Sequence, residues 1–313
     1  MAVDDHEAGE ILDCFRSEAG VRQAPEVKFR HIAGADHGRR RVIFSDLLGD
    51  HGALAGRASV YMVDKHFFIT AKIIDLLLEE HAYARGKNLH AGGLARELAR
   101  MLFSEGPRAL KQEGFGRLIS TMVDFASARN REGGVVSVDH LFHEINSAWA
   151  GSTLRKVSDL LFALRTTRSE AEEFLQHLGD GDIPAMEPLV PCVTAAIAWW
   201  ANRLVDINVL TDEQRVLTDD RLSMIAKAAP LKWGPIRVLP GTPLRSLVRG
   251  VSKAHPSIQL ADLVAGAGQA VARRHVGAPS VAGEELWQTI VPIITDNGMT
   301  SGGDPGRFAA VNP

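Results

Sequence analysis

The sequence predicts an α/β fold, in which helices pack on a mixed sheet and a large all-helical segment is inserted. Two observations lead to this prediction. Segments with strand-like patterns occur toward both ends of the chain, at 25–32, 57–65, 206–211 and 244–251. Between them, residues 66–204 carry apolar side chains at helical spacing almost throughout. We therefore predict a discontinuous α/β domain at 1–65 and 205–295, a helical insertion at 66–204 and a disordered tail at 296–313.

The first 65 residues contain signals for two helices and two strands. Asp4 or Asp5 is suited to cap a helix that runs to about residue 19, and Gly20 ends it. Residues 25–32 alternate charged and apolar side chains, which is typical of a half-exposed strand. A helix is expected at 39–48, followed by a buried strand at 57–65 that is rich in β-formers at its centre.

The rest of the chain divides at glycines and prolines. Gly-containing breaks separate several helices within 66–204. After them we expect, in order, a strand at 206–211, a helix at 218–229, a strand at 244–251, a helix that ends near 275 and a last helix at 284–294. The tail from 296 is rich in Gly, Asp, Asn and Pro, which is typical of disorder.

Composition bounds the function only broadly. The chain has 35 basic and 38 acidic residues among 313, so any nucleic-acid binding must use a local patch. Its two cysteines, Cys14 and Cys192, lie far apart, which favours a reducing, cytoplasmic setting. The N-terminus lacks the apolar core of a signal peptide, and the longest uncharged run is shorter than the about 18 apolar residues that a spanning helix needs. We therefore expect no membrane association.

Asp262 is the carboxylate that stands out on the helix before residue 275. It belongs to a stripe of Gln259, Asp262, Gly266, Gln269 and Arg273, which are spaced three or four residues apart. An ionised carboxylate buried in an apolar helix face costs several kcal/mol unless it is paired or bound to a metal. Asp262 is therefore either a structural group, which caps or pairs with Arg273 or a nearby lysine, or a site residue. Gly266 leaves room for a backbone or a ligand to approach.

Other charged residues fall at the ends or on one face of predicted strands. Asp212 comes just after an apolar strand, and Asp64 and Lys65 have the same position on an earlier one. Sites in open α/β sheets lie at the carboxyl ends of strands. Turn or helix-cap roles are the alternative for both aspartates. Glu26 and Lys28 alternate on one strand face and form either part of a site or a solvated edge.

These pieces occur in an order that resembles the family called domain of unknown function 3800. The segments that carry the resemblance are Glu26-Val27-Lys28, Val63-Asp64-Lys65, Asp212-Glu213-Gln214, Ser252-Lys253 and Ile258-Gln259-Leu260-Ala261-Asp262. The resemblance implies a ribonuclease-H-like mixed sheet and a metal-dependent nuclease activity. It implies Glu26, Asp64, Asp212 and Asp262 as metal ligands, with Glu26, Asp212 and Asp262 as the catalytic carboxylates.

The implied chemistry is hydrolysis of phosphodiester bonds in a nucleic acid. Two divalent ions would activate water and stabilise the leaving oxygen, and oxygen ligands suit Mg²⁺ or Mn²⁺. The resemblance suggests Lys28 or Lys65 for phosphate contact and Ser252 for substrate binding. Gln259 would orient the substrate or Asp262.

The chain departs from the family pattern at its start. Family members begin with a strand that carries Asp-Glu-Ser, whereas Met1-Ala2-Val3 resembles the end of the second strand and a helix follows at once. We therefore expect an N-terminally truncated sheet with exposed edges, which favour self-association into a homo-oligomer or partner binding. The alternative function is a non-catalytic interaction protein on a degenerate scaffold of this kind.

Overall fold

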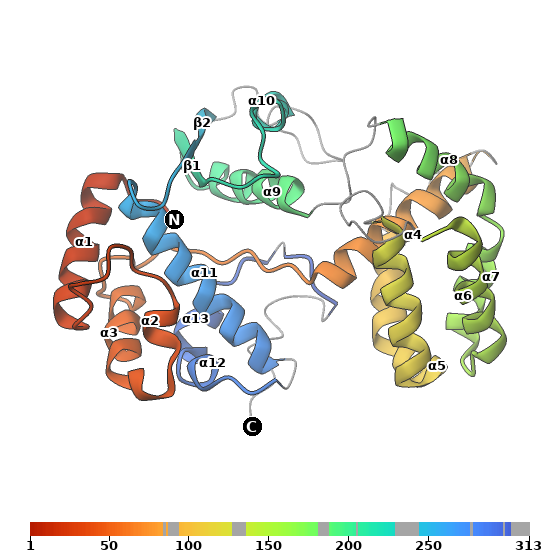
Figure 1. The fold of residues 1–313 in the computed structure, drawn as a ribbon, viewed down its shortest axis with the longest axis horizontal. Coiled ribbons are helices and arrows are strands. Elements are labelled where there is room, and N and C mark those ends of the chain that lie inside the picture. Colours follow the sequence, from red (N-terminus) through yellow and green to blue (C-terminus); the bar gives the residue numbers. More distant parts are fainter. Residues whose placement is uncertain are drawn as a thin grey trace. The chain divides into compact units, whose positions relative to one another are not determined.

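The protein is described by a computed structural model that covers residues 1–83, 86, 94–126, 136–180, 188–204, 206–228, 244–275, 278–296 and 298–301. The chain forms two compact units (Figure 1). The first is built from Met1–Met62 and Leu189–Gly298, and the second from Val63–Pro188 with the short segment that starts at Met299. Most of the predicted disordered tail, residue 297 and everything from 302 onward, lies outside the described residues.

The first unit contains a sheet that differs from the predicted one. In the described part of the chain the sheet has two strands, β1 (Ile207–Asp212) and β2 (Leu244–Gly250), which pair in parallel. Both were predicted, and Asp212 at the end of β1 lies opposite Gly250 at the end of β2. The prediction of a mixed, ribonuclease-H-like sheet flanked by helices is wrong, because the described chain is mostly helical and supplies no further strand to this pair.

Two predicted strands are absent because their backbone groups have other partners. In 25–32, the Val27 N–H donates to the side chain of Gln259 and the Lys28 N–H donates to His31 Nδ1. The helix α2 (Arg30–Ala33) then begins. In 57–65 the backbone makes only isolated bridges, from Val60 to Ile294 and from Val63 to Met299. The alternating pattern of 25–32 therefore reflects alternating exposure of its side chains, and this segment does not pair with another strand.

The longer helices of the first unit follow the predictions, whereas the short α2 and η1 (Ala35–His37) were not predicted. The helices of this unit are α1 (Asp5–Glu18), α2, η1, α3 (Gly38–Leu48), α9 (Leu189–Ala201), α10 (Asp219–Ala228), α11 (Pro256–His275), α12 (Val281–Glu285), α13 (Trp287–Ile290) and η3 (Val291–Ile293). Asp4 caps α1 by accepting from the Glu7 N–H at 2.9 Å, and Gly20 adopts a left-handed φ of 67° after it. The single last helix predicted at 284–294 is divided into short pieces, the final one with Pro292 in its first turn.

The core of the first unit is organised around α11. Its buried side chains, among them Leu260, Leu263 and Val271, belong to one apolar cluster with Leu12 and Phe15 of α1. Gly266 permits a close approach on this helix, because a Cβ there would lie 2.3 Å from Cβ of Phe29. The space that the sequence suggested at Gly266 is therefore used by a side chain of the protein.

The second unit is all-helical. It consists of α4 (Lys65–Tyr83), α5 (Leu94–Ala126), α6 (Val138–Gly151), α7 (Arg155–Arg165) and α8 (Arg168–Asp180), which enclose a core of their own. The helical periodicity predicted for this part of the chain is confirmed. The last helix of that stretch, α9, belongs to the first unit, where Ile197 packs with Leu217, Leu222 and Ile225. Among the described helices, none combines the length and apolarity needed to cross a bilayer.

Candidate functional site

Asp212 and Asp262 line the same pocket of the first unit, with a volume of about 330 Å³. Asp212 is the last residue of β1, and Asp262 lies in the second turn of α11. Alternate residues of a strand share a face, so Asn208, Leu210 and Asp212 present one side of β1. Residues three or four apart share a helix face, and the α11 side is formed in this way by Ser257, Ile258, Ala261, Asp262 and Ala265.

The Asp262 side chain is exposed to solvent. The desolvation cost expected for a carboxylate buried in an apolar face therefore does not arise. Within the described residues, the Asp262 carboxylate has no hydrogen-bond or ion-pair partner, so the predicted pairing with Arg273 is not formed there. Asp262 is thus an unpaired anion on the wall of a pocket.

The other polar side chains of the pocket include a second carboxylate, Asp212, and the uncharged groups of Asn208, Gln214 and Ser257. The Asp212 carboxylate accepts from the Glu213 N–H at 3.0 Å, which fixes its direction at the end of β1. Asn208 accepts from the Ser246 hydroxyl at 2.8 Å, and Gln214 completes the strand side. The described residues that line the pocket include no lysine, arginine or histidine. Met1 also lines the pocket, and burial lowers the pKa of its α-amino group, so the two carboxylates are the acidic groups to which a cation could bind.

Four other candidates form a separate cluster, in which they bind one another. The Ser252 hydroxyl donates to Glu26, and the Lys28 ammonium lies 3.4 Å from the same carboxylate. The hydrogen bond from Ser252, with a smaller contribution from Lys28, holds the pKa of Glu26 below its ordinary value. None of the three lines the Asp212–Asp262 pocket.

Gln259, the fourth member of this cluster, is buried. Its carboxamide oxygen accepts from the Val27 N–H at 3.0 Å and from Arg16 at 3.2 Å, and its amide nitrogen donates to the Ser252 carbonyl at 2.8 Å. Both ends of the side chain therefore hold protein groups, joining α11 to two loops and to α1.

Asp64 and Lys65 lie in the second unit. The Asp64 carboxylate accepts from the His66 N–H at 2.9 Å and from the Phe67 N–H at 3.1 Å, so it caps α4. Lys65 is exposed on the first turn of that helix. These contacts correspond to the helix-cap alternative for Asp64.

Within the first unit, the three predicted metal ligands Glu26, Asp212 and Asp262 do not line one common pocket. In the described part of the chain, no group of three or more His, Cys, Asp or Glu side chains is arranged to hold a metal ion. Of the four predicted ligands, Asp212 and Asp262 share a pocket, Glu26 belongs to a neighbouring polar cluster of the same unit, and Asp64 belongs to the other unit.

A polar group at the start of α11 was missed by sequence reasoning. His255 Nδ1 lies 2.5 Å from Asp5 Oδ2, and the Ser257 hydroxyl donates to Asp5 Oδ1 at 2.5 Å. The Ser257 N–H also donates to Asp5, at 3.2 Å. Partial burial raises the pKa of Asp5, but the bonds from Ser257 and His255 outweigh it, so that this pKa lies below its ordinary value. The sequence signal was the helix start at His255-Pro256, whereas the distant partner Asp5 was read as a cap of α1.

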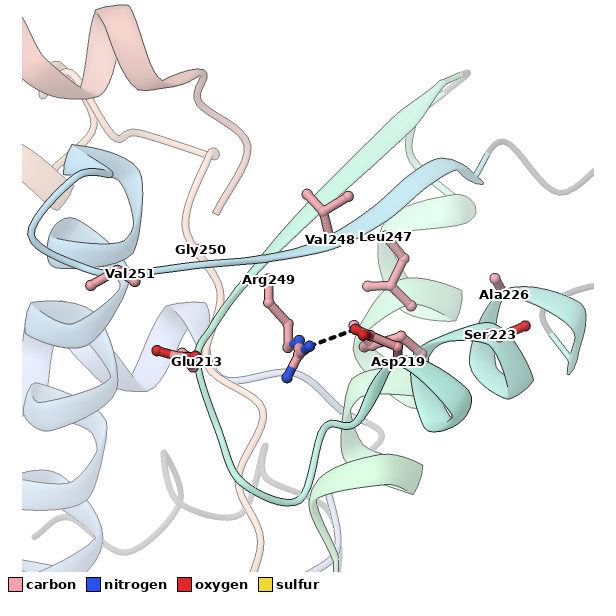
Figure 2. A pocket seen from close by; sticks show the side chains of 10 residues that line it. Glu213, Asp219, Ser223, Ala226, Leu247, Val248, Arg249, Gly250 and Val251 are labelled. Atoms are coloured by element: carbon pink, nitrogen blue, oxygen red, sulfur yellow. Dashed lines mark hydrogen bonds and ion pairs between the residues drawn. The ribbon is translucent and has the colours of Figure 1, made fainter.

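A second, larger pocket of about 530 Å³ lies between β2 and α10 (Figure 2). Arg249 points from β2 toward α10 and donates to Asp219 at 2.5 Å, while Val248 points to the opposite side of the strand. Val248 and Val251 are about half exposed, at 49% and 50%. This pocket therefore contains a neutralised ion pair, and the half-exposed Val248 side chain lies on the face of β2 that is turned away from it.

Comparison with known proteins adds no relative. No family model, no curated protein and no solved structure matches the chain. The likeness to the family named above therefore rests on the short motifs of the sequence.

Proposed function

We propose that the protein hydrolyses phosphodiester bonds of a nucleic acid, with a divalent cation, Mg²⁺ or Mn²⁺, held by Asp212 and Asp262. The observation that carries this proposal is that two carboxylates from different elements, β1 and α11, line one pocket. Mg²⁺ in enzymes that act on phosphates is usually bound by one or two carboxylates, and water and substrate oxygens complete its coordination.

The donor atoms of the pocket suit such a cation. Carboxylate and carboxamide oxygens are hard ligands, which favour Mg²⁺ or Mn²⁺ over softer metals. Within the pocket they are supplied by Asp212, Asp262, Asn208 and Gln214. The exposure of Asp262 leaves its charge available to an incoming ion. When bound, the cation supplies an activated water and neutralises charge on the phosphate.

The residues of the chain have two tasks in this proposal. Asp212 and Asp262 provide the negative charge that the cation requires, since the lining has no cationic side chain to bind phosphate directly. The carboxamides of Asn208 and Gln214 can donate to phosphate oxygens and orient them. Leu210 and Ile258 provide an apolar wall of the same pocket.

A hydrolysis assay with matched variants tests the proposal. Single-stranded DNA and RNA oligonucleotides are incubated with the full chain and Mn²⁺, and Asp212→Asn and Asp262→Asn are compared with Asp220→Asn, which changes an exposed aspartate of α10 outside the pocket. We expect the first two variants to lose at least about 100-fold in rate, because electrostatic stabilisation of a transition state is worth this much or more. Asp220→Asn should retain the rate. Equal rates in all four proteins would refute the assigned site.

Partner binding without catalysis is a second candidate. It is favoured by the half-exposed side chains of Val248 on β2 and Val251 just after it, because exposed apolar side chains are typical of interaction sites when they form a patch. A wild-type chain that takes up no Mn²⁺ and cleaves neither oligonucleotide favours this candidate over the enzyme.

A further inference from the structure

One edge of strand β2 has backbone groups without hydrogen-bond partners. The Glu213 N–H, just after β1, donates to the Gly250 carbonyl at 3.0 Å, so this carbonyl faces β1. In a parallel pair, alternate residues of a strand direct their N–H and C=O groups to the same neighbour. Val248 therefore faces β1 like Gly250, whereas Leu247 and Arg249 direct theirs to the other edge. Within the described residues, these outward groups have no hydrogen-bond partner.

The pocket of about 530 Å³ runs along this edge. It is lined by every residue of β2 from Leu247 to Gly250, and by Val251 after the strand. Successive residues of a strand point to opposite faces of a sheet, so a pocket that is lined by all of them meets the strand at its edge. The opposite wall is formed by α10 (Figure 2), which contributes Leu222 and Ala226. An unpaired strand edge and a concave surface therefore lie together.

The charged side chains of this pocket leave one carboxylate uncompensated. Arg249 is paired with Asp219. The exposed Glu213 carboxylate has no hydrogen-bond or ion-pair partner within the described residues. Beside these groups, the buried Leu222 and the half-buried Leu247 provide apolar surface. An occupant with apolar side chains and a cationic group at one end is therefore complementary to the pocket.

From these observations we propose that the edge of β2 binds an extended peptide of another protein, which adds to the sheet as a further strand. Main-chain hydrogen bonds to Leu247 and Arg249 supply the affinity, and the pocket selects the side chains, as in recognition by β-strand addition. Alternate side chains of the peptide enter the pocket, where apolar ones contact Leu222 and a lysine or arginine lies near Glu213. The site is separate from the proposed cation site, because the two pockets share no lining residue.

A second copy of the chain suits this edge less well than a peptide of different sequence. If two β2 strands paired in antiparallel fashion about Leu247, Arg249 of each chain would lie opposite Arg245 of the other. Like charges directly opposite each other destabilise a strand pair. A peptide with uncharged residues at these positions avoids this repulsion.

The first test requires no ligand. Amide hydrogen exchange of the full chain, measured by NMR, should be slow at Val248 and Gly250, whose N–H groups face β1, and fast at Leu247 and Arg249. Protection of Leu247 and Arg249 equal to that of Val248 and Gly250 would overturn the proposal, because another segment or a second copy would then occupy the edge.

The second test uses synthetic peptides. A library of peptides of about seven residues, with Val, Ile or Leu at alternate positions, Thr between them and Lys at one end, is screened against the full chain by fluorescence polarisation. The peptide that binds most tightly is then prepared with N-methyl groups on either alternate set of its amides. Methylation of the set that faces β2 should weaken binding at least about 10-fold, and methylation of the other set should change it less than about 2-fold. Equal effects of the two sets, or no binding by any library member, would overturn the proposal.

Protein variants separate this edge from the proposed cation site. Glu213→Gln should weaken binding of the Lys-ended peptide several-fold, whereas Asp220→Asn, which changes an exposed aspartate outside the pocket, should leave it unchanged. Asp262→Asn should bind the peptide like the wild-type chain, because Asp262 lines the other pocket. An affinity that is unchanged in Glu213→Gln, or lost in Asp262→Asn, would overturn the assignment of the peptide to this edge. Peptide binding by a chain that takes up no Mn²⁺ would refute the proposed function alone.

Discussion

Arg41 and Glu285 form a two-pronged ion pair in the first unit, with Arg41 Nε 2.7 Å from Glu285 Oε2 and Arg41 Nη2 3.0 Å from Oε1. The Arg41 side chain is buried; its Nη1 donates to the backbone carbonyls of residues 32 and 34, and Nη2 donates also to that of residue 35. One guanidinium thus connects α3, the turn before it and α12. A sequence shows such a residue only as one member of a basic run.

Replacing this arginine should destabilise the first unit strongly. Arg41→Met leaves three carbonyls and Glu285 without their donor, and breaking a buried pair typically costs about 3–5 kcal/mol. We expect a loss near the lower figure, because Glu285 is partly exposed. Urea unfolding of Arg41→Met, with the exposed Arg39→Met as the control, measures it. A difference below about 1 kcal/mol between the two variants would contradict this role.

Gly266 should tolerate no side chain. In an open helix position, replacing glycine by alanine stabilises by about 1 kcal/mol. Here the new Cβ would lie 2.3 Å from Cβ of Phe29, so Gly266→Ala should instead destabilise by about 1–3 kcal/mol. The double variant with Phe29→Ala should be destabilised by less than the sum of the destabilisations of the two single variants. Strict additivity in this double-mutant cycle would mean that the contact is unimportant.

Gln259 should behave as a structural clamp. Gln259→Met keeps the shape of the side chain but removes the acceptor of the buried Val27 N–H, which costs about 1–3 kcal/mol. The exposed Gln269→Met on the same helix should have an effect within about 0.5 kcal/mol. Thermal unfolding of both variants provides the comparison, and equal midpoints would show that the three bonds of Gln259 contribute nothing.

Acid should destabilise the first unit. The pKa values of Asp5, Glu26 and Glu285 lie below the ordinary values of 3.8 for Asp and 4.5 for Glu. As the pH falls, these carboxylates are therefore protonated in the unfolded chain before they are protonated in the folded chain. Their full contribution to the free energy of unfolding is present above the ordinary pKa values. It is lost as the pH falls through the lower pKa values of the folded state. Urea midpoints between pH 7 and pH 3 should show this decline, with a shallower slope in Asp5→Asn. An unchanged slope would contradict it.

The helices could be predicted from the sequence because their causes are local. Apolar spacing, the Asp4 cap and Gly20 define α1, and similar signals define α10 and α11. Asp212 and Asp262 could be singled out in the same way, by their positions on a strand and on a helix. Their common pocket depends on packing β1 against α11.

The errors arose where distant residues decide the structure. Charged and apolar residues alternate in the segment 25–32 as they do in a strand. However, the Val27 N–H donates to the Gln259 side chain and the Lys28 N–H donates to His31, so neither is available to a neighbouring strand. The Asp5–His255 pair joins the two ends of the first unit, and neither residue signals the other in the sequence. The mixed sheet was inferred from short motifs whose order is compatible with other arrangements of the chain.

Calorimetric titration of the full chain with Mn²⁺ tests the central claim most directly, because it requires neither a substrate nor turnover. The wild-type chain and Asp220→Asn should bind the ion with the same affinity. Asp262→Asn, with an unchanged unfolding midpoint, should bind it at least about 10-fold more weakly, which corresponds to about 1.4 kcal/mol. Binding of equal strength in Asp262→Asn, or no binding by the wild-type chain, would contradict a cation site at Asp212 and Asp262.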